Sequence, residues 1–148
     1  QKTAYEIGVR LVGSEMCIRD RRIPISAEPH LLSPSDFEHL VAKIIELRTG
    51  YRTTVCGGAG DGGVDVRVYD LKDKLVGVVQ CKRYEPSKTL APMFVRELAH
   101  VKQREGVNTA YLVTTAAFSS DTRREAEAAG IKLLDGDALK RLTVVAVV

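Results

Sequence analysis

Between Leu32 and Leu142, the apolar residues follow the helical period in some segments and alternate with polar residues in others. The first helical segment begins after Ser33, which can cap the amino terminus, and Pro34, which suits a first helical position. Gly50 is a typical residue at the end of a helix. The predicted helix has one apolar face, formed by Phe37, Leu40, Val41, Ile44 and Leu47.

Strict alternation marks two runs that flank the short polar segment DLKDK. Successive side chains of a strand point to opposite faces, so we expect one face of the first run to carry Val64, Val66 and Val68. On the second run, one face is expected to carry Val76, Val78, Gln80 and Lys82. A polar turn of this length favours an antiparallel hairpin. Such a hairpin brings Asp65 beside Gln80 and Lys82.

The remaining elements follow from the same rules. Residues 51–55 are predicted to form a short strand, NTAYLVTT a buried strand and residues 131–134 another short strand. Helices are predicted over residues 92–106 and 119–130 and within DGDALKRL. This order predicts the α/β class, with a mixed β-sheet that contains a central antiparallel hairpin and is flanked by α-helices.

Residues 1–21 differ from the rest, because they show no sustained amphipathic period and no signal-peptide layout. The segment RLVGSEMCIRDR resembles a translated sequencing-adapter artefact, and a natural, partly helical extension is the alternative. We therefore expect residues 1–21 to be an artefactual or disordered extension and residues 22–31 to be a lead-in. Residues 32–142 are expected to form the domain, and residues 143–148 a short apolar tail, either an edge strand or the start of a further segment.

The net charge of +3 gives little support for binding to nucleic acid. Residues 1–22 hold five of the 22 Lys and Arg and three of the 19 Asp and Glu, which leaves 17 basic and 16 acidic side chains. The three cysteines, Cys17, Cys56 and Cys81, have neither CxxC nor zinc spacing. Sparse thiols without a secretion signal favour a cytoplasmic protein, and no apolar run is long enough to span a membrane.

The predicted hairpin gathers a carboxylate, an amide oxygen and an amine at one end of the sheet, from Asp65, Gln80 and Lys82. Taken singly, each has a structural explanation, since strand lysines often protect an edge and a carboxylate can be solvated there. The preceding loop, CGGAGDGG, permits a close approach to phosphate, but no GK[ST] follows it, so it is not a Walker loop. Asp61 in this loop is expected to be a turn residue.

The order of Asp65, Gln80 and Lys82 resembles the PD-(D/E)XK nuclease motif in its Q-x-K form. The sequence GDGGVDV…VVQCKRY is similar to the catalytic domain of Mrr-type restriction endonucleases, and the similarity runs from about Leu32 to Leu142. The resemblance implies a restriction-endonuclease-like core and a metal-dependent endonuclease that hydrolyses phosphodiester bonds of double-stranded DNA. The implied cofactor is Mg²⁺, with Mn²⁺ as a substitute.

The resemblance also implies roles for individual residues. Asp65 is the charged metal ligand, Gln80 the neutral ligand and the backbone carbonyl of Cys81 a third, while Lys82 orients the attacking water or stabilises developing charge. Glu38, in the first turns of the predicted helix, leans toward the active site in this family, although an acidic residue there also suits the helix dipole. Basic residues that follow the motif are candidates for contacts with the DNA backbone, namely Arg83, Lys88 and Arg96.

Three other functions stay open at this point. A Holliday-junction resolvase shares the core fold and would prefer branched DNA, and a non-catalytic DNA-binding module would keep the fold without cleavage. A structural domain with a degenerate site is the third. The resemblance leaves open a homodimer and a DNA-recognition domain that precedes the sequence given.

Overall fold

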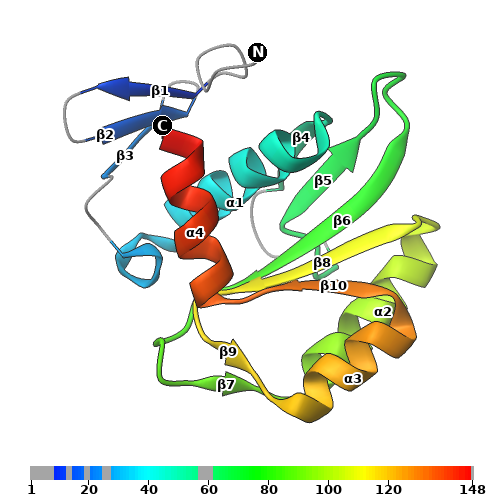
Figure 1. The fold of residues 1–148 in the computed structure, drawn as a ribbon. Helices are drawn as coiled ribbons and strands as arrows, with labels where there is room; N and C mark the ends of the chain where they lie inside the picture. The colour runs from blue at the N-terminus through cyan, green and yellow to red at the C-terminus, as the bar shows by residue number, and fades with distance from the viewer. Residues whose placement is uncertain (1–8, 13–14, 19–20, 25–27, 57–61, 148) are drawn as a thin grey trace.

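The computed structural model describes residues 9–12, 15–18, 21–24, 28–56 and 62–147 (Figure 1). Among these residues, five strands form one mixed sheet in the order β10-β8-β6-β5-β4. Strands β4 (Arg52–Val55), β5 (Val66–Tyr69) and β6 (Leu75–Lys82) are antiparallel neighbours, whereas β6, β8 (Thr109–Thr114) and β10 (Ile131–Leu134) run parallel. The predicted central hairpin is therefore confirmed, and β6 joins the antiparallel half to the parallel half.

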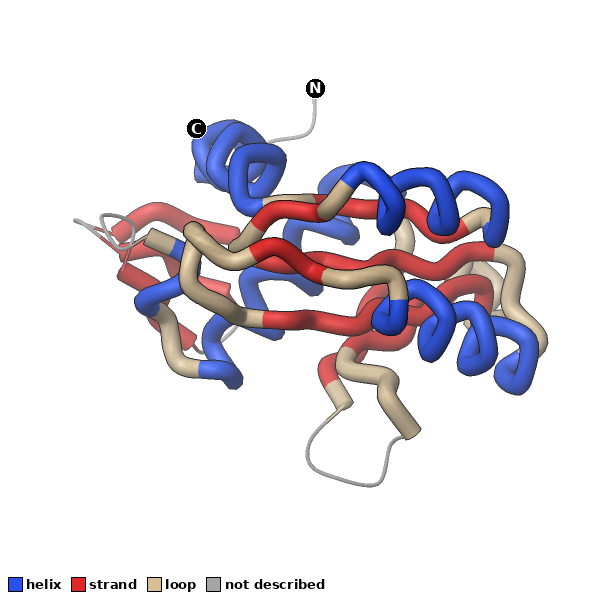
Figure 2. The backbone as a smooth tube through the Cα atoms, turned by 90° about the horizontal axis from the view of Figure 1, so that it is seen from below, coloured by secondary structure: helices blue, strands red, loops and turns tan. Residues whose placement is uncertain are grey.

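Helices cover both faces of this sheet, as the side and bottom views show (Figures 1 and 2). On one face, α1 (Pro34–Thr49) and α4 (Gly136–Val147) contribute Phe37, Ile44 and Leu139 to a core that also holds Val66, Val79 and Val113. On the other, α2 (Met93–Glu105) and α3 (Ser120–Ala129) pack over Val78, Ala110 and Leu112. The predicted α/β class, with a mixed sheet flanked by helices, is confirmed.

The ends of the helices follow the capping residues read from the sequence. The Ser33 side chain accepts a hydrogen bond from Asp36 N at 3.1 Å, and Gly50 closes α1 at a φ of 74°. Ser119 caps α3 by accepting from Thr122 N at 3.1 Å. Positive φ values at such helix ends cost little only for glycine, which explains why the predicted boundaries hold.

The predicted faces of the hairpin strands are wrong at two valines. Val64 packs in the core under α2, whereas Val66 and Val68 pack under α1. The chain bends at Asp65 between them, directly after Gly62 and Gly63 with φ values of 62° and 84°. On β6, Val78 faces α2 but Val76 packs against the α1 core, because the register shifts between Val68 and Tyr69. Alternation assumes a regular ladder, which glycine turns and bulges interrupt.

Both ends of the chain are more regular than the sequence predicts. Within the described parts of residues 9–24, β1 (Val9–Val12), β2 (Glu15–Ile18) and β3 (Arg21–Pro24) pair antiparallel, with β1 beside α4 and β2 beside α1. These strands lie within the segment that we expect to be an artefactual or disordered extension, and that expectation stays a prediction. Residues 1–8, 13–14 and 19–20 of that segment lie outside the described residues.

The expected apolar tail is not an edge strand, since α4 continues through Val147. Nothing between Leu142 and Val147 breaks a helix, and the Thr143 hydroxyl donates to Leu139 O at 2.7 Å within it. Short elements without a sequence signal complete the fold, namely the 3₁₀ turn η1 (Pro29–Leu31) and the parallel pair β7 (Thr89–Leu90) and β9 (Ala117–Phe118). In the part of the chain that the structure describes, no helix is both long and apolar enough to cross a bilayer.

Candidate active site

Asp65 lies where the chain enters β5. Its backbone is held on both sides, by a hydrogen bond from Asp65 N to Val79 O at 2.9 Å and from Cys56 N to Asp65 O at 2.8 Å. The β5–β6 register ends at the Val66–Val79 pair, and just beyond it the carboxylate Oδ2 of Asp65 accepts from Cys81 N at 2.7 Å. The carboxylate therefore contacts the backbone of β6 at Cys81, the residue between Gln80 and Lys82.

Gln80 is a buried amide on the face of β6 that α2 covers. The residue is 7% exposed, and its Oε1 has no hydrogen-bond partner among the described residues. A methyl group built on Gly63 would lie 3.4 Å from Gln80 Nε2 and 3.6 Å from Val101 Cγ2. The bare glycine backbone thus leaves room for the amide. A buried carbonyl oxygen without a partner costs free energy, so this oxygen is suited to a ligand.

Lys82 follows Gln80 on the same face, at the carboxyl end of β6. Its Nζ lies 5.2 Å from the centre of the Phe94 ring, at the start of α2. Its backbone carbonyl accepts from the Thr114 hydroxyl at 2.7 Å, which ties the end of β6 to the end of β8. The ammonium group is thus held by a ring on one side and by a fixed backbone on the other.

Glu38 and Cys81 approach the site from the opposite face. Burial, and secondly the charge of Asp65, raise the pKa of the Glu38 carboxyl above its usual value. Burial also raises the pKa of the Cys81 thiol well above its usual value, and Asp65 and Glu38 add to this while Lys82 opposes it. Glu38, Asp65 and Lys82 thus all lie within electrostatic range of the Cys81 thiol, and Asp65 also lies within range of Glu38.

A pocket of about 170 Å³ opens beside these groups, between the first turns of α1 and the end of β6. It is lined by Pro34, Phe37, Glu38, Cys81 and Arg83. Both a carboxylate and a guanidinium reach its wall, so it can admit water and polar groups. The pocket gives solvent a route toward Glu38.

The candidate DNA contacts lie in different surroundings. Arg83 is exposed, and its Nη1 donates to His30 O at 2.9 Å. Lys88 is exposed in the segment between β6 and β7. The guanidinium of Arg96 binds Glu125 twice, at 2.8 Å from Nε and 2.5 Å from Nη2. The structure thus brings Arg83 to the site and engages Arg96 with α3.

Sequence reasoning missed the residues that hold this site from a distance. Thr114 fixes Lys82 O, Thr115 hydrogen-bonds to the backbone of Tyr84, and the Phe94 ring supports the Lys82 ammonium. No local pattern marks them, because each contact joins segments separated by a helix or a strand. The QCKRY segment contains Tyr84, but a single tyrosine gives no signal by itself.

The donor set determines which ion this site could hold. Among the described residues, no group of three or more His, Cys, Asp or Glu side chains is arranged to hold a metal. The oxygens of Asp65 and Gln80 are nevertheless hard donors, and the Gln80 oxygen has no other described partner. Hard oxygen donors in small number fit Mg²⁺ or Mn²⁺, which keep several waters, better than they fit zinc.

Comparison with known proteins now adds to this geometry. A family model described as restriction endonuclease, the Mrr catalytic domain, matches residues 30–143. The fold is similar to that of the MspJI restriction endonuclease solved in complex with a 27-mer oligonucleotide, with a TM-score of 0.55 and 24% identity over 74% of this chain and 27% of that one. Among curated proteins, no sequence matches the chain.

Two further solved structures share the fold. A protein from Vibrio cholerae has a TM-score of 0.51 and 20% identity over 73% of this chain and 31% of that one. The restriction endonuclease FokI has a TM-score of 0.50 and 16% identity over 80% of this chain and 26% of that one. The chain spans about a quarter of the length of the MspJI and FokI chains.

Proposed function

The chain belongs to the restriction endonuclease family through its match to the Mrr catalytic domain over residues 30–143, and we propose that it hydrolyses phosphodiester bonds of double-stranded DNA with a divalent metal ion. The proposed catalytic unit is residues 32–142. Mg²⁺ is the expected ion, and Mn²⁺ can replace it.

One observation carries the proposal, the buried Gln80 oxygen one residue before Cys81, whose backbone N donates to the Asp65 carboxylate. Within the described chain, Oε1 of Gln80 has no hydrogen-bond partner although the residue is 7% exposed. A merely structural amide in this position would be expected to find a partner, because an unsatisfied buried acceptor costs about 1–3 kcal/mol. A bound cation would satisfy this oxygen and balance the Asp65 charge.

Asp65, Gln80 and the carbonyl of Cys81 are the residues that would hold the ion. Along a strand, the N–H and C=O of one residue point to the same neighbour, so the Cys81 carbonyl faces the side on which its N–H meets Asp65. When bound, the ion supplies Lewis-acid chemistry that polarises the phosphate and makes water a better nucleophile. Because Gln80 is neutral, the protein provides one formal charge fewer than a Glu would.

The other residues act on water and phosphate directly. The Lys82 ammonium, held over the Phe94 ring, donates hydrogen bonds to the phosphate oxygens, whose negative charge increases as phosphorus is attacked. Glu38 reaches the pocket from α1 and orients the attacking water or takes its proton at a carboxylate oxygen. The raised pKa of Glu38 moves that carboxyl toward the range in which proton transfer is effective.

The test measures cleavage of plasmid and linear duplex DNA by the full chain with Mg²⁺, with Mn²⁺ and with a chelator. We expect metal-dependent nicking by the wild-type protein. Gln80→Glu should keep cleavage and need less metal, because it keeps the ligating oxygen and adds charge, whereas Gln80→Leu should lose cleavage. Metal-independent binding without any cleavage would identify a DNA-binding module instead, and cleavage confined to four-way junctions would identify a resolvase.

A further inference from the structure

Tyr84 is an exposed aromatic residue two positions after Lys82, and its backbone is clamped. Tyr84 is 39% exposed to solvent. Tyr84 N donates to the Thr115 hydroxyl at 2.8 Å, and the same hydroxyl donates to Tyr84 O at 2.5 Å. Thr115 itself is buried, at 4% exposure, so the segment directly after β8 holds the backbone of this tyrosine from inside the fold.

The Tyr84 ring contacts the same phenylalanine that lies beside the Lys82 ammonium. It packs against Phe94 with ring centres 6.2 Å apart and planes inclined at 56°, and the Lys82 ammonium lies 5.2 Å from the centre of the same Phe94 ring. Lys82 and Tyr84 thus both lie beside the Phe94 ring. The exposed part of the tyrosine is left available for contact with another molecule.

Cationic side chains lie on the same segment of the chain as Tyr84. Arg83 and Lys88 are exposed on the same segment, which has Glu85 as its acidic member. Clamped aromatic rings beside cations are the features with which proteins bind single-stranded nucleic acid, since a base stacks on the ring while the cations hold its backbone. Two residues of extended chain span about 7 Å, which corresponds to about two base steps of a DNA strand.

We propose that Tyr84 stacks on a DNA base that has left the duplex within about two nucleotides of the bond that is cleaved. This inference rests on the proposed function, because it places the phosphate at Lys82. In an intact duplex both faces of each base are already covered, so the ring can be used only where a base is unpaired or extruded. The preferred substrate is therefore duplex DNA with a mismatch, a bulge or a frayed end at the cleavage position.

The test uses duplexes that carry 2-aminopurine opposite either its partner thymine or an abasic position, scanned through three nucleotides on each side of the cleaved bond. Stacking on tyrosine quenches 2-aminopurine fluorescence, and binding is measured with the full chain without added metal. The wild-type protein should quench the unpaired base and bind that duplex about 5- to 100-fold more tightly than the paired one. Cleavage with metal should show the same preference.

The variants Tyr84→Leu and Tyr84→Phe separate stacking from other contacts, and Tyr51→Leu is the matched control. Tyr51 is 38% exposed and lies beside the hairpin-turn end of β4, far along the sheet from Lys82. Tyr84→Leu should abolish quenching and the preference, while Tyr84→Phe and Tyr51→Leu keep both. If Tyr84→Phe behaves like Tyr84→Leu, the hydroxyl binds phosphate and the stacking proposal is wrong.

Two further results would contradict the stacking proposal without contradicting the proposed nuclease activity. In the first, the wild-type protein cleaves DNA but does not quench the unpaired base at any scanned position. In the second, Tyr84→Leu keeps the preference for the unpaired base. Wild-type quenching needs no variant, so the proposal stays testable even if Tyr84→Leu does not fold. Failure of the wild-type protein to cleave any DNA with either metal would instead refute the proposed function.

Discussion

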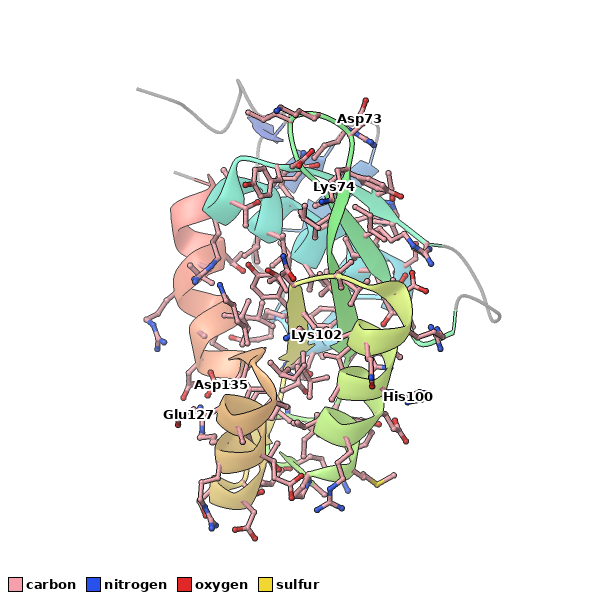
Figure 3. The ribbon with its side chains drawn as sticks, turned by 90° about the vertical axis from the view of Figure 1, so that its right-hand side faces the viewer. Asp73, Lys74, His100, Lys102, Glu127 and Asp135 are labelled. Carbon is pink, nitrogen blue, oxygen red and sulfur yellow. The ribbon has the colours of Figure 1, made fainter. Side chains whose placement is uncertain are left out.

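The two ends of the β5–β6 hairpin contrast in how their polar groups are satisfied. At the turn, Asp70 Oδ1 accepts from Lys72 N at 2.8 Å and from Lys74 N at 3.0 Å. Asp73 pairs with Arg52 at 3.0 Å, and the Arg52 guanidinium also lies 4.5 Å from the centre of the Tyr69 ring. Figure 3 shows Asp73 and Lys74 at the tip of this turn. The turn thus closes on partners from the hairpin and the adjoining β4.

At the opposite end, the polar groups converge from several elements. Asp65 meets Cys81 N, the Gln80 oxygen has no partner in the described chain, and Glu38 on α1 has a raised pKa. This end also has an acid, a cation and an aromatic ring, as the turn does, yet it alone of the two holds a buried oxygen, that of Gln80, without a partner among the described residues. The difference teaches that residue types alone do not mark the end for which we propose a function, whereas an unsatisfied buried oxygen does.

The largest effect is expected when one carboxylate at each end is neutralised. Asp65→Asn keeps size and an acceptor for Cys81 N but removes the charge, so cleavage should fall by about 10³-fold or more. The control Asp73→Asn tolerates the positive φ of 62° at that position and should cleave like the wild type. A nicking assay with matched protein concentrations measures both. Equal activity of the two variants would mean that the ends do not differ in function.

The next effect concerns one lysine at each end. Lys82→Ala should lower kcat by about 10²- to 10³-fold while metal affinity stays nearly unchanged, because an ammonium is not a ligand. Lys74→Ala, at the turn, should change neither quantity. Single-turnover cleavage and a metal titration followed by calorimetry provide the two readouts. Loss of metal binding in Lys82→Ala would assign the lysine to the structure of the site rather than to the reaction.

Glu38→Gln should separate function from stability. Since the folded-state pKa of Glu38 is raised, its favourable contribution is full below the ordinary carboxyl pKa and is lost as pH rises through the raised value. Above the raised pKa the wild type loses this contribution whereas glutamine cannot ionise, so the variant should have the higher Tm there, and this gain should vanish in acid. Cleavage should fall by about 10²- to 10³-fold.

A melting series from pH 3 to 8 and a cleavage profile check these two signs. A helix-dipole role would give the reverse, a lower Tm at pH 7 with cleavage unchanged. The acid end of the series is the internal control, because the wild type and the variant should have similar stability there.

The smallest effect compares two glycines with left-handed backbones. Gly63 has a φ of 84° and Gly50 a φ of 74°, so alanine at either position should cost about 1–2 kcal/mol of unfolding free energy. A methyl group at Gly50 meets no atom within 4 Å, whereas at Gly63 it meets Gln80 Nε2 at 3.4 Å. Only Gly63→Ala should therefore also raise the metal concentration needed for cleavage. Urea unfolding and a metal titration measure the pair.

The hairpin and the helix boundaries could be predicted because their determinants are local. Val66, Gln80 and Lys82 lie on two strands joined by one polar turn, and Ser33 and Gly50 act on the helix they adjoin. Alternation fails where the backbone departs from a ladder, which is why Val64 faces α2 instead of α1.

The rest of the site could not be predicted, because its contacts cross the sequence. Thr115 lies 31 residues from Tyr84, and Thr114 lies 32 residues from Lys82. Their side chains find these backbones only after α2 and β8 have packed. The state of the Gln80 oxygen likewise depends on how closely Gly63 and α2 approach, and no single-residue pattern contains that information.

The position of β6 between an antiparallel and a parallel neighbour has a consequence for the order of folding. The hydrogen bond from Cys81 N to Asp65 spans 16 residues, whereas the one from Tyr84 N to Thr115 spans 31. Short-range hairpins form in microseconds, while parallel pairing must wait for the intervening helix. In pulsed hydrogen exchange during refolding, the Cys81 amide should gain protection before the Tyr84 amide. A newly synthesised chain would then gather its candidate metal ligands before it fixes Lys82, so the proposed ion site would form before the proposed cleavage site is complete.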